Sequence, residues 1–245
     1  MRVVSKEDFL SKKKSDTVII YGSGPTISSL TKEEKDKLNS IDSIGFNWFC
    51  KSSIPTTFYT IREQATTSKR VSKKMGITPQ HLIDFMNSDY YIDTCLVMHD
   101  MSGFPNHDFV YSDHLDEFKG HGVMVKELKR KIDVPKKFDV RYYNKDIFDD
   151  GVYHGHCSLS NAIHIAIGMG YQEIVFVGVD LYDSRYFWRG DKKYLLINDV
   201  KEPHKVGDPT IKMIRSINKR SLIKMYSYNK KSLLSKFLDV WGDKV

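Results

Sequence analysis

Residues 158–182 read SLSNAIHIAIGMGYQEIVFVGVDLY, and this stretch decides the fold class. Apolar residues recur at helical spacing from Leu159 to Ile167, and Gly170 can adopt the left-handed turn that ends a helix. The run at 173–180 is rich in β-branched and aromatic residues without alternation, which is typical of a strand covered by helices on both faces. The stretch therefore predicts a helix, a glycine turn and a central parallel strand.

The end of this predicted strand points to a functional site. Its last residues, Gly178, Val179 and Asp180, are soon followed by Tyr182. Ligands of open parallel sheets bind in the crevice at the carboxyl ends of the strands, so we expect Asp180 and Tyr182 to lie near a ligand. The alternative, which this stretch alone favours, is an ordinary helix–strand unit that ends in a capping Asp180.

The composition predicts one α/β domain with anionic partners. A chain of 245 residues can bury one large core, and we treat residues 1–245 as a single domain. Lys and Arg outnumber Asp and Glu by 38 to 31, which gives a net charge of +7. This excess favours nucleotide phosphates, an acidic membrane surface or nucleic acid as partners, although a solvated lysine-rich surface is its commonest explanation.

Cysteine usage and hydropathy predict a protein of a reducing compartment. Cys50, Cys95 and Cys157 lack the paired spacing of disulfide frameworks and zinc sites. No apolar run reaches the length of a membrane span. We therefore expect a cytoplasmic protein that is free in solution or peripheral on the inner face of the membrane.

A glycine turn follows the first predicted strand. Residues 17–21 form a short buried-strand run, and residues 22–25, Gly-Ser-Gly-Pro, break it. Glycines permit positive φ and the close approach of a ligand, so backbone N–H groups here could cradle a phosphate or a ribose. Ile27 replaces the third glycine of the dinucleotide fingerprint, and no P-loop lysine follows. A plain strand-to-helix turn explains these residues about as well.

Further strand-like runs bring polar residues to the same edge of the predicted sheet. Residues 41–46 end at Asn47, whose side chain can bind a nucleotide or satisfy its own turn. Residues 55–60 end at Thr60. We expect additional strands at 95–98, 138–143 and 222–227, and helices at 31–38, 62–75, 79–87, 232–241 and from 208 onward.

Two segments predict irregular structure near the site. Residues 101–116 are rich in His, Asp, Gly and Pro, and their histidines lack metal-ligand spacing. Residues 183–207 are charged and poorly periodic, which predicts a mobile lid. His154 and His156 precede the central helix and could face a phosphate, although surface histidines are the alternative.

Four separated pieces of the chain together resemble one family. They are residues 18–30 (VIIYGSGPTISSL), 45–49 (GFNWF), 162–182 and 226–238 (YSYNKKSLLSKFL). Their order and spacing resemble the bacterial family-42 sialyltransferases, which use CMP-activated sialic acid, and related sialyltransferase-like proteins. The first and third pieces also resemble flagellin-glycosylating accessory factors and a pterin diphosphokinase group. The resemblance covers most of the chain and implies a Rossmann-like, mostly parallel α/β sheet with helices on both faces, in the GT-A-like variant of sialyltransferases, plus a small lid.

The resemblance also implies a set of site residues, matched position by position. It places the nucleotide at Gly22, Ser23, Gly24, Pro25 and Asn47. It places the donor sugar at Thr60 and Ser158, and the leaving phosphate at Tyr182 and Tyr186. A strand-end carboxylate falls at Asp180, and the catalytic base falls at His204. Three positions depart from the family, because Ser23 and Thr60 each replace an asparagine and Gly155 replaces an arginine. The local sequence alone favours an exposed histidine of the lid at position 204, and the resemblance reverses this order.

The implied activity is the inverting transfer of sialic acid or a related acidic sugar from a CMP-sugar donor to a glycan or glycolipid acceptor, as in lipopolysaccharide or capsule biosynthesis. The resemblance implies no metal cofactor. We further expect a homo-oligomer, peripheral contact with an anionic membrane and no nucleic-acid ligand. The second hypothesis is a Mg-dependent pterin-type diphosphokinase, in which Asp180 and Asp183 would hold the metal. The third is a nucleic-acid-binding module, suggested by the net charge of +7.

Overall fold

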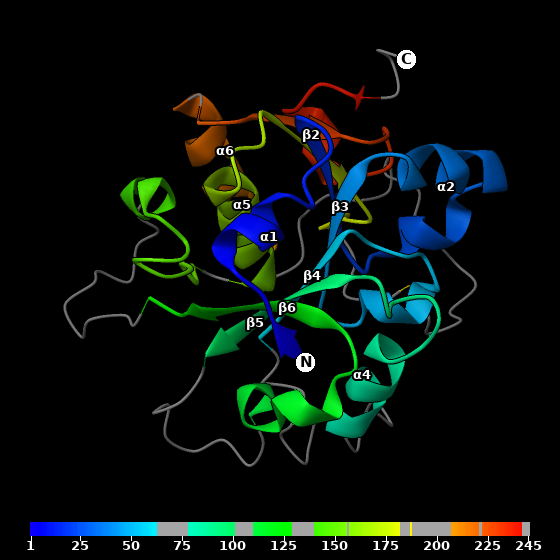
Figure 1. Ribbon diagram of the computed structural model, residues 1–245. Helices are drawn as coiled ribbons and strands as arrows, with labels where there is room; N and C mark the ends of the chain where they lie inside the picture. The colour runs from blue at the N-terminus through cyan, green and yellow to red at the C-terminus, as the bar shows by residue number, and fades with distance from the viewer. Residues whose placement is uncertain are drawn as a thin grey trace.

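The computed structural model describes most of the chain (Figure 1). The described residues are 1–62, 78–100, 110–128, 140–155, 157–181, 187, 207–220 and 222–241. The predicted helix at 62–75 lies almost entirely outside them, as do residues 101–109 of the predicted loop. None of the described helices is both long and apolar enough to cross a membrane.

A parallel sheet of eight described strands forms the centre of the molecule (Figure 1). The strands are β1 (Arg2–Val3), β2 (Thr17–Tyr21), β3 (Asp42–Phe46), β4 (Phe58–Ile61), β5 (Cys95–Asp100), β6 (His121–Lys126), β7 (Glu173–Val177) and β8 (Lys224–Ser227). Their order is β1-β6-β5-β4-β3-β2-β7-β8, and every neighbouring pair is parallel. The prediction of a buried parallel strand within residues 173–180 is confirmed, but β7 lies next to the edge strand β8 and not at the centre of the sheet.

Helices cover both faces of this sheet. The α-helices are α1 (Lys6–Leu10), α2 (Lys32–Asn39), α4 (Pro79–Met86), α5 (Ser158–Gly168) and α6 (Gly207–Lys219). The 3-10 helices are η1 (Pro25–Ser29), η2 (Phe49–Ser52), η4 (Tyr111–Glu117), η5 (Val140–Asn144) and η8 (Leu233–Lys236). Figure 1 shows α1, α5 and α6 on one side of the sheet and α2 and α4 on the other. The predicted α/β fold with helices on both faces is thereby confirmed.

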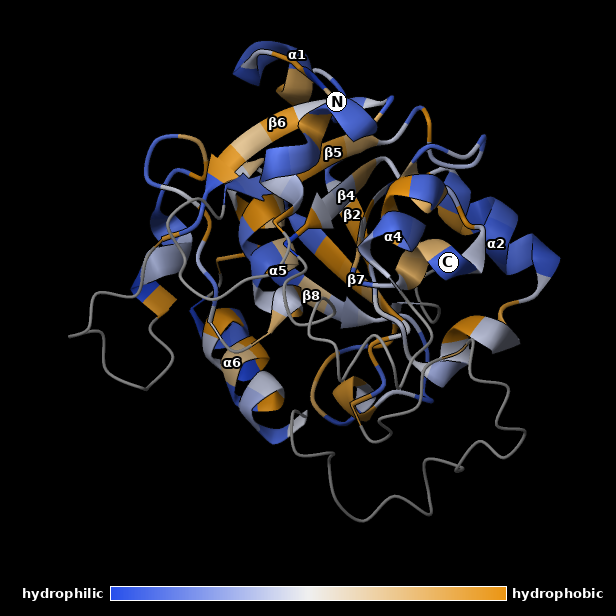
Figure 2. Cartoon of the chain, turned by 90° about the horizontal axis from the view of Figure 1, so that it is seen from below, coloured by the Kyte–Doolittle hydropathy of each residue, from blue (hydrophilic) through white to orange (hydrophobic). Residues whose placement is uncertain are grey.

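The strands divide their side chains between two hydrophobic cores. On β2, Val18 and Ile20 pack with α5 and α6, whereas Ile19 and Tyr21 pack with α2 and α4. Successive side chains of a strand point to opposite faces, so a strand that is buried on both faces needs an uninterrupted apolar run. Figure 2 accordingly shows mainly hydrophobic colour along β5 and β6 and mainly hydrophilic colour over α2.

Two predictions of secondary structure are wrong. The strand expected at 138–143 is the 3-10 helix η5 over its described part, because Val140 and Tyr143 bury the same face at i, i+3 spacing. The helix expected at 232–241 shortens to η8, because the chain then extends to pair Val240 with Ser227 beside β8. In this pairing, the Ser227 N–H donates to the Asp239 carbonyl at 3.0 Å.

Among the described strands and α-helices, β1, α1 and β6 were not predicted from the sequence. The sequence of β6 contains Gly122, which is a weak strand former. A Cβ atom at Gly122 would lie 2.0 Å from the Leu96 carbonyl oxygen of β5. The close approach of the neighbouring strand, rather than a turn, therefore requires this glycine.

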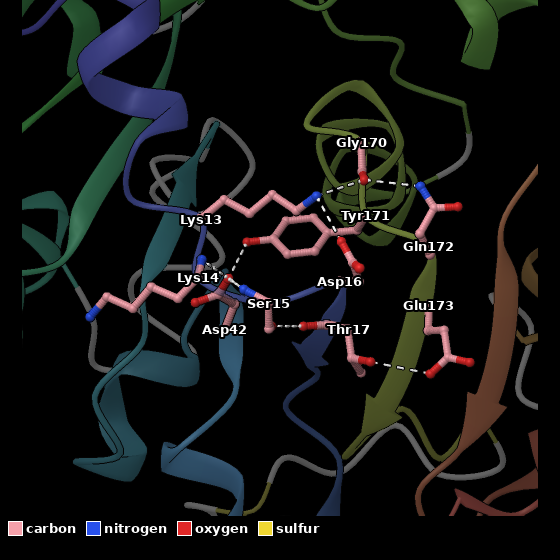
Figure 3. A network of polar contacts seen from close by, with 10 residues as sticks. All are labelled: Lys13, Lys14, Ser15, Asp16, Thr17, Asp42, Gly170, Tyr171, Gln172 and Glu173. Atoms are coloured by element: carbon pink, nitrogen blue, oxygen red, sulfur yellow. Dashed lines mark hydrogen bonds and ion pairs between the residues drawn. The ribbon is translucent and has the colours of Figure 1, made fainter.

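Asp42 joins three segments at the amino edge of the sheet (Figure 3). Its Oδ2 atom accepts hydrogen bonds from the Lys14 N–H at 2.7 Å, the Ser15 N–H at 3.0 Å and the Tyr171 hydroxyl at 3.0 Å. Only 3% of Asp42 is exposed. Because hydrogen bonds to a buried charge are strong, this carboxylate holds the start of β2 and the turn before β7 against β3.

We expect Asp42→Ala to lower the free energy of unfolding by about 3 kcal/mol or more, because it leaves buried donors without an acceptor. Tyr171→Phe is the matched control, and it should cost only about 1 kcal/mol because it removes one of the three bonds. Urea unfolding of both variants measures the difference. Equal losses in the two variants would show that the carboxylate is not the centre of this network.

Candidate functional site

The order of the strands creates a crevice between β2 and β7. From β2 the chain adds β3, β4, β5 and β6 on one side, whereas β7 and β8 add on the other side. Ligands of open parallel sheets bind at the carboxyl ends of the strands where the order reverses in this way. Residues 22–25 leave β2 at this point, and residues 178–181 leave β7 beside them.

The glycine turn packs against the end of β7. The Gly22 N–H donates to the Val177 carbonyl at 2.7 Å, and the Gly24 N–H donates to the Gly178 carbonyl at 2.8 Å. A Cβ atom on Gly22 would lie 2.3 Å from the Gly178 oxygen, and one on Gly24 would lie 2.4 Å from Oδ2 of Asp180. Contact between two loops therefore requires these glycines, and their N–H groups already have protein acceptors.

The carboxylate of Asp180 holds the glycine turn through hydrogen bonds to Thr26. Its Oδ2 atom accepts from the Thr26 N–H at 2.9 Å and its Oδ1 atom from the Thr26 hydroxyl at 2.6 Å. The carboxylate is 2% exposed, and Pro25 begins η1 directly beside it. A carboxylate at the first N–H groups of a helix is a favourable cap. The geometry matches the capping alternative for Asp180.

Three buried polar atoms without partners belong to residues near the ends of β2 and β3. Within the described residues, the Tyr21 hydroxyl, the Ser23 hydroxyl and Nε1 of Trp48 are buried and make no hydrogen bond. These residues lie at the carboxyl ends of β2 and β3. Buried polar groups in native proteins are almost always hydrogen-bonded, so a ligand or water is expected to complete each of these atoms.

Two residues with unusual backbone angles flank these atoms. Asn47 has φ 53° at the end of β3, and its carbonyl accepts from the Tyr59 hydroxyl at 2.6 Å. Leu181 has φ 65° just after β7. A non-glycine residue in the left-handed region costs on the order of 1 kcal/mol, and such residues cluster at functional sites. The sequence pattern identified Asn47 but gave no signal for Leu181.

A second polar network lies at the ends of β4, β5 and β6. The Thr60 hydroxyl is 2.8 Å from Nε2 of His99, and these residues are 3% and 1% exposed. Burial, together with the positive charges of Arg62 and His154, lowers the pKa of His99 to about 3. Arg62 binds Glu127 through two hydrogen bonds of 2.7 and 2.8 Å. Thr60 is therefore tied into a buried network that the sequence did not reveal.

The amino end of α5 reaches the same edge. Because α5 connects to β7 through a tight turn at Gly170, its first residue, Ser158, lies at the carboxyl edge of the sheet. Nδ1 of His154 is 2.6 Å from Oδ1 of Asn161 in the first turn of α5. His154 therefore belongs to a side-chain pair, and His156 lies outside the described residues.

Phe187, which belongs to the predicted lid segment, is described and contacts the glycine turn. Its N–H donates to the Ser23 carbonyl at 3.2 Å, and its carbonyl accepts from the Ser28 hydroxyl at 3.3 Å. The Phe187 ring also meets the Phe49 ring edge-on, with centroids 6.4 Å apart. Tyr182, Tyr186, His204 and most of residues 183–207 lie outside the described residues.

The described part of the chain contains no group of three or more His, Cys, Asp or Glu side chains placed to hold a metal ion. No family model matches the sequence, and no curated protein matches it.

Solved structures share the fold. The sialyltransferase CstII from Campylobacter jejuni, in complex with the substrate analogue CMP-3FNeuAc, is 20% identical with a TM-score of 0.52, over 91% of this chain and 86% of that chain. The monofunctional α-2,3-sialyltransferase Cst-I from Campylobacter jejuni is 15% identical with a TM-score of 0.48, over 98% and 82%. The chain therefore has a Rossmann-like α/β fold similar to that of sialyltransferase structures.

Proposed function

We propose that the protein is an inverting glycosyltransferase that moves sialic acid or a related acidic sugar from a CMP-sugar to a glycan or glycolipid acceptor. The observation that carries this proposal is the set of unpartnered polar atoms at the ends of β2 and β3, where a ligand of this fold is expected. The four sequence pieces that resemble sialyltransferases contain most of β2, the end of β3, β7 and the end of β8, which are neighbouring strands of the sheet. The likeness of the fold to CstII supports the same reading.

The contacts of the glycine turn suggest which residues shape the turn and which bind the nucleotide. Gly22, Gly24, Pro25 and Asp180 shape the turn through contacts within the protein. Ser23 and Asn47 then remain as the side chains that bind the nucleotide. Ser158 and Thr60 would face the donor sugar, with Thr60 positioned by His99. The N–H groups of Gly22 and Gly24 bind carbonyls at the end of β7, which argues against the expectation that they cradle the phosphate.

The proposed reaction moves one proton and one electron pair. His204 would take the proton of the acceptor hydroxyl as its oxygen attacks the anomeric carbon. The bond between that carbon and the phosphate oxygen breaks, and CMP leaves with the electron pair. The hydroxyls of Tyr182 and Tyr186 would donate hydrogen bonds to the departing phosphate, which is how a site can stabilise developing charge without a metal.

A calorimetric titration tests the nucleotide first. Purified protein is titrated with CMP, CDP, UDP, GDP and ATP in EDTA and then in Mg²⁺. We expect CMP to bind in EDTA. Binding of ATP only with Mg²⁺ would replace the proposal with the diphosphokinase, and steeply salt-dependent binding of nucleic acid would favour the third hypothesis. If the protein binds none of these nucleotides, the glycine turn is an ordinary connection between β2 and η1.

Asn47→Gly is expected to weaken CMP binding about tenfold, because it removes the amide side chain and keeps a backbone that tolerates positive φ. The matched control is Ser53→Gly, since Ser53 also has positive φ, at 54°, and ends η2 instead of a strand of the crevice. The same calorimetric titration measures both. Unchanged affinity in Asn47→Gly would remove Asn47 from the nucleotide site.

The proposed partners beyond the donor rest on the sequence. Contact with an anionic membrane is predicted from the basic runs and would appear as cosedimentation with anionic vesicles that is lost at high salt. A homo-oligomer is also predicted, and cysteine usage and hydropathy predict a cytoplasmic protein that is free in solution or peripheral on the inner face of the membrane.

A further inference from the structure

A groove lies between α2 and the segment after β8. Its volume is about 530 Å³, within the range of ligand pockets. The lining residues are Glu33, Glu34, Lys37, Tyr228, Asn229, Lys230, Lys231, Val240 and Trp241.

Aromatic rings and fixed polar groups line this groove together. The Tyr228 and Trp241 rings lie 6.4 Å apart at an angle of 34°, and Nζ of Lys37 lies 5.6 Å from the centre of the Trp241 ring. The Tyr228 hydroxyl donates to Oε1 of Glu34 at 3.0 Å. Oε2 of Glu34 accepts from the Thr31 N–H at 2.8 Å, so this carboxylate is held from two sides.

This combination matches the chemistry of a sugar. The face of a pyranose ring is a flat patch of C–H groups that packs against an aromatic ring, and its hydroxyls need donors and acceptors around the rim. Glu33 and Asn229 can supply acceptors at the rim. The lining contains three lysines and two glutamates, and Lys230 and Lys231 are both exposed. The excess of positive charge favours a sugar that carries an anionic group.

The groove is close to the crevice at β2 and β7. Nζ of Lys231 donates to the Ser29 hydroxyl at 3.4 Å, and Ser29 ends the 3-10 helix η1 that Pro25 begins. A 3-10 helix rises about 2 Å per residue, so η1 spans about 10 Å, roughly the length of two sugar units. The segment is also anchored to the β7 loop, because the Ser232 hydroxyl donates to the Val179 carbonyl at 2.6 Å.

We propose that this groove binds an acidic saccharide, and that this saccharide is a distal unit of the acceptor glycan. The first statement depends only on the groove. The second rests on the proposed function, because it needs sugar transfer at the crevice. A glycan that spans η1 would present its terminal hydroxyl to the crevice while a charged unit lies against Trp241.

Direct binding tests the groove without any donor. The probes are a trisaccharide that bears a carboxylate on one sugar and the same trisaccharide with that carboxylate reduced to an alcohol. We expect the charged probe to bind by calorimetry, and the reduced probe to bind at least fivefold more weakly. Trp241→Ala should weaken binding at least tenfold. The control Tyr90→Ala removes another exposed aromatic ring, 59% exposed, and should change nothing.

A second variant covers the case in which Trp241→Ala unfolds. The double substitution Lys230→Gln and Lys231→Gln changes two exposed side chains, and it should remove the preference for the charged probe. The proposal is overturned if neither probe binds, or if Trp241→Ala folds and binds both as the wild type does. Equal binding of the two probes would overturn the anionic preference. Selective binding of an acidic peptide would assign the groove to a protein partner instead.

A CMP titration of the same samples separates this proposal from the proposed function. If the saccharide binds and CMP does not, the groove is a saccharide site and the transferase proposal fails. If CMP binds and neither saccharide does, the groove proposal alone fails. Trp241→Ala should leave CMP affinity unchanged, because the groove and the crevice are separated by η1.

Discussion

Replacing His204 with alanine is expected to lower the rate of sugar transfer by about 10²–10⁴-fold, the usual contribution of a general base. The acceptor hydroxyl is a weak nucleophile, and its proton must leave as the new bond forms. An imidazole with an ordinary pKa of about 6.5 can accept that proton near neutral pH. Alanine cannot, although the nucleotide contacts at Ser23 and Asn47 remain, so CMP affinity should stay nearly constant.

Single-turnover transfer with saturating CMP-sugar measures this effect on the chemical step. A matched control is His114→Ala, because His114 is partly exposed and pairs with Glu117 on η4. The dependence of the wild-type rate on pH should show a fall on the acid side that His204→Ala lacks. If His204→Ala turns over as fast as the control variant, His204 is not the general base and is instead an exposed histidine of the lid.

The fold was largely predictable because its signals are local. The apolar period in residues 158–167 and the unbroken run from residue 173 can each be read within one stretch of sequence, although the cores that they join include distant segments. The edge of the sheet that carries the site followed from this pattern, since the carboxyl ends of parallel strands meet at one edge. Asn47 and Thr60 therefore lie at the predicted edge.

The roles of individual residues were less predictable because they depend on contacts between distant segments. The need for glycine at positions 22 and 24 arises from residues 178–180, which lie more than 150 positions away in sequence. Asp180 is occupied by Thr26 for the same reason. The pairing of Thr60 with His99 likewise requires the β4–β5 register. No local pattern reports these contacts.

The wrong prediction of a helix at residues 232–241 explains why the sequence did not reveal the groove beside Trp241. Apolar residues at helical spacing in 232–241 suggested a helix docked on the core. In the structure, the chain extends after η8 so that Val240 pairs beside β8, and this places Trp241 against Lys37 of α2. The groove thus exists because tertiary pairing overrides helix propensity at this point.

Acidification from pH 7 to pH 4 is expected to lower the free energy of unfolding by about 6 kcal/mol through two buried histidines. Burial lowers the pKa of His99 to about 3 and that of His164 to about 4. In the unfolded chain both titrate near pH 6.5. Between these values the unfolded state binds more protons, so stability is full above about pH 6.5 and falls as the pH decreases toward 4. In this window, each histidine lowers the free energy of unfolding by about 1.4 kcal/mol for every unit by which the pH falls.

The contacts of His164 explain why its neutral form is required. Nδ1 of His164 accepts from the Tyr153 N–H at 2.8 Å, so Nε2 carries the proton and donates to the Lys145 carbonyl at 3.1 Å. A second proton on Nδ1 would displace the Tyr153 bond inside the core that α5 shares with η5. A loss of about 6 kcal/mol is comparable with the whole stability of many domains, so acid unfolding should begin well above pH 4.

Urea unfolding at half-unit steps from pH 7 to pH 4.5 measures this linkage. Carboxylates also titrate toward the lower end, so the comparison with variants isolates the histidines. Each of His164→Gln and His99→Gln should reduce the slope of unfolding free energy against pH by about one proton between pH 6 and 5. A slope that neither substitution changes would mean that both imidazoles are protonated in the folded protein, which would contradict their burial at 0% and 1% exposure.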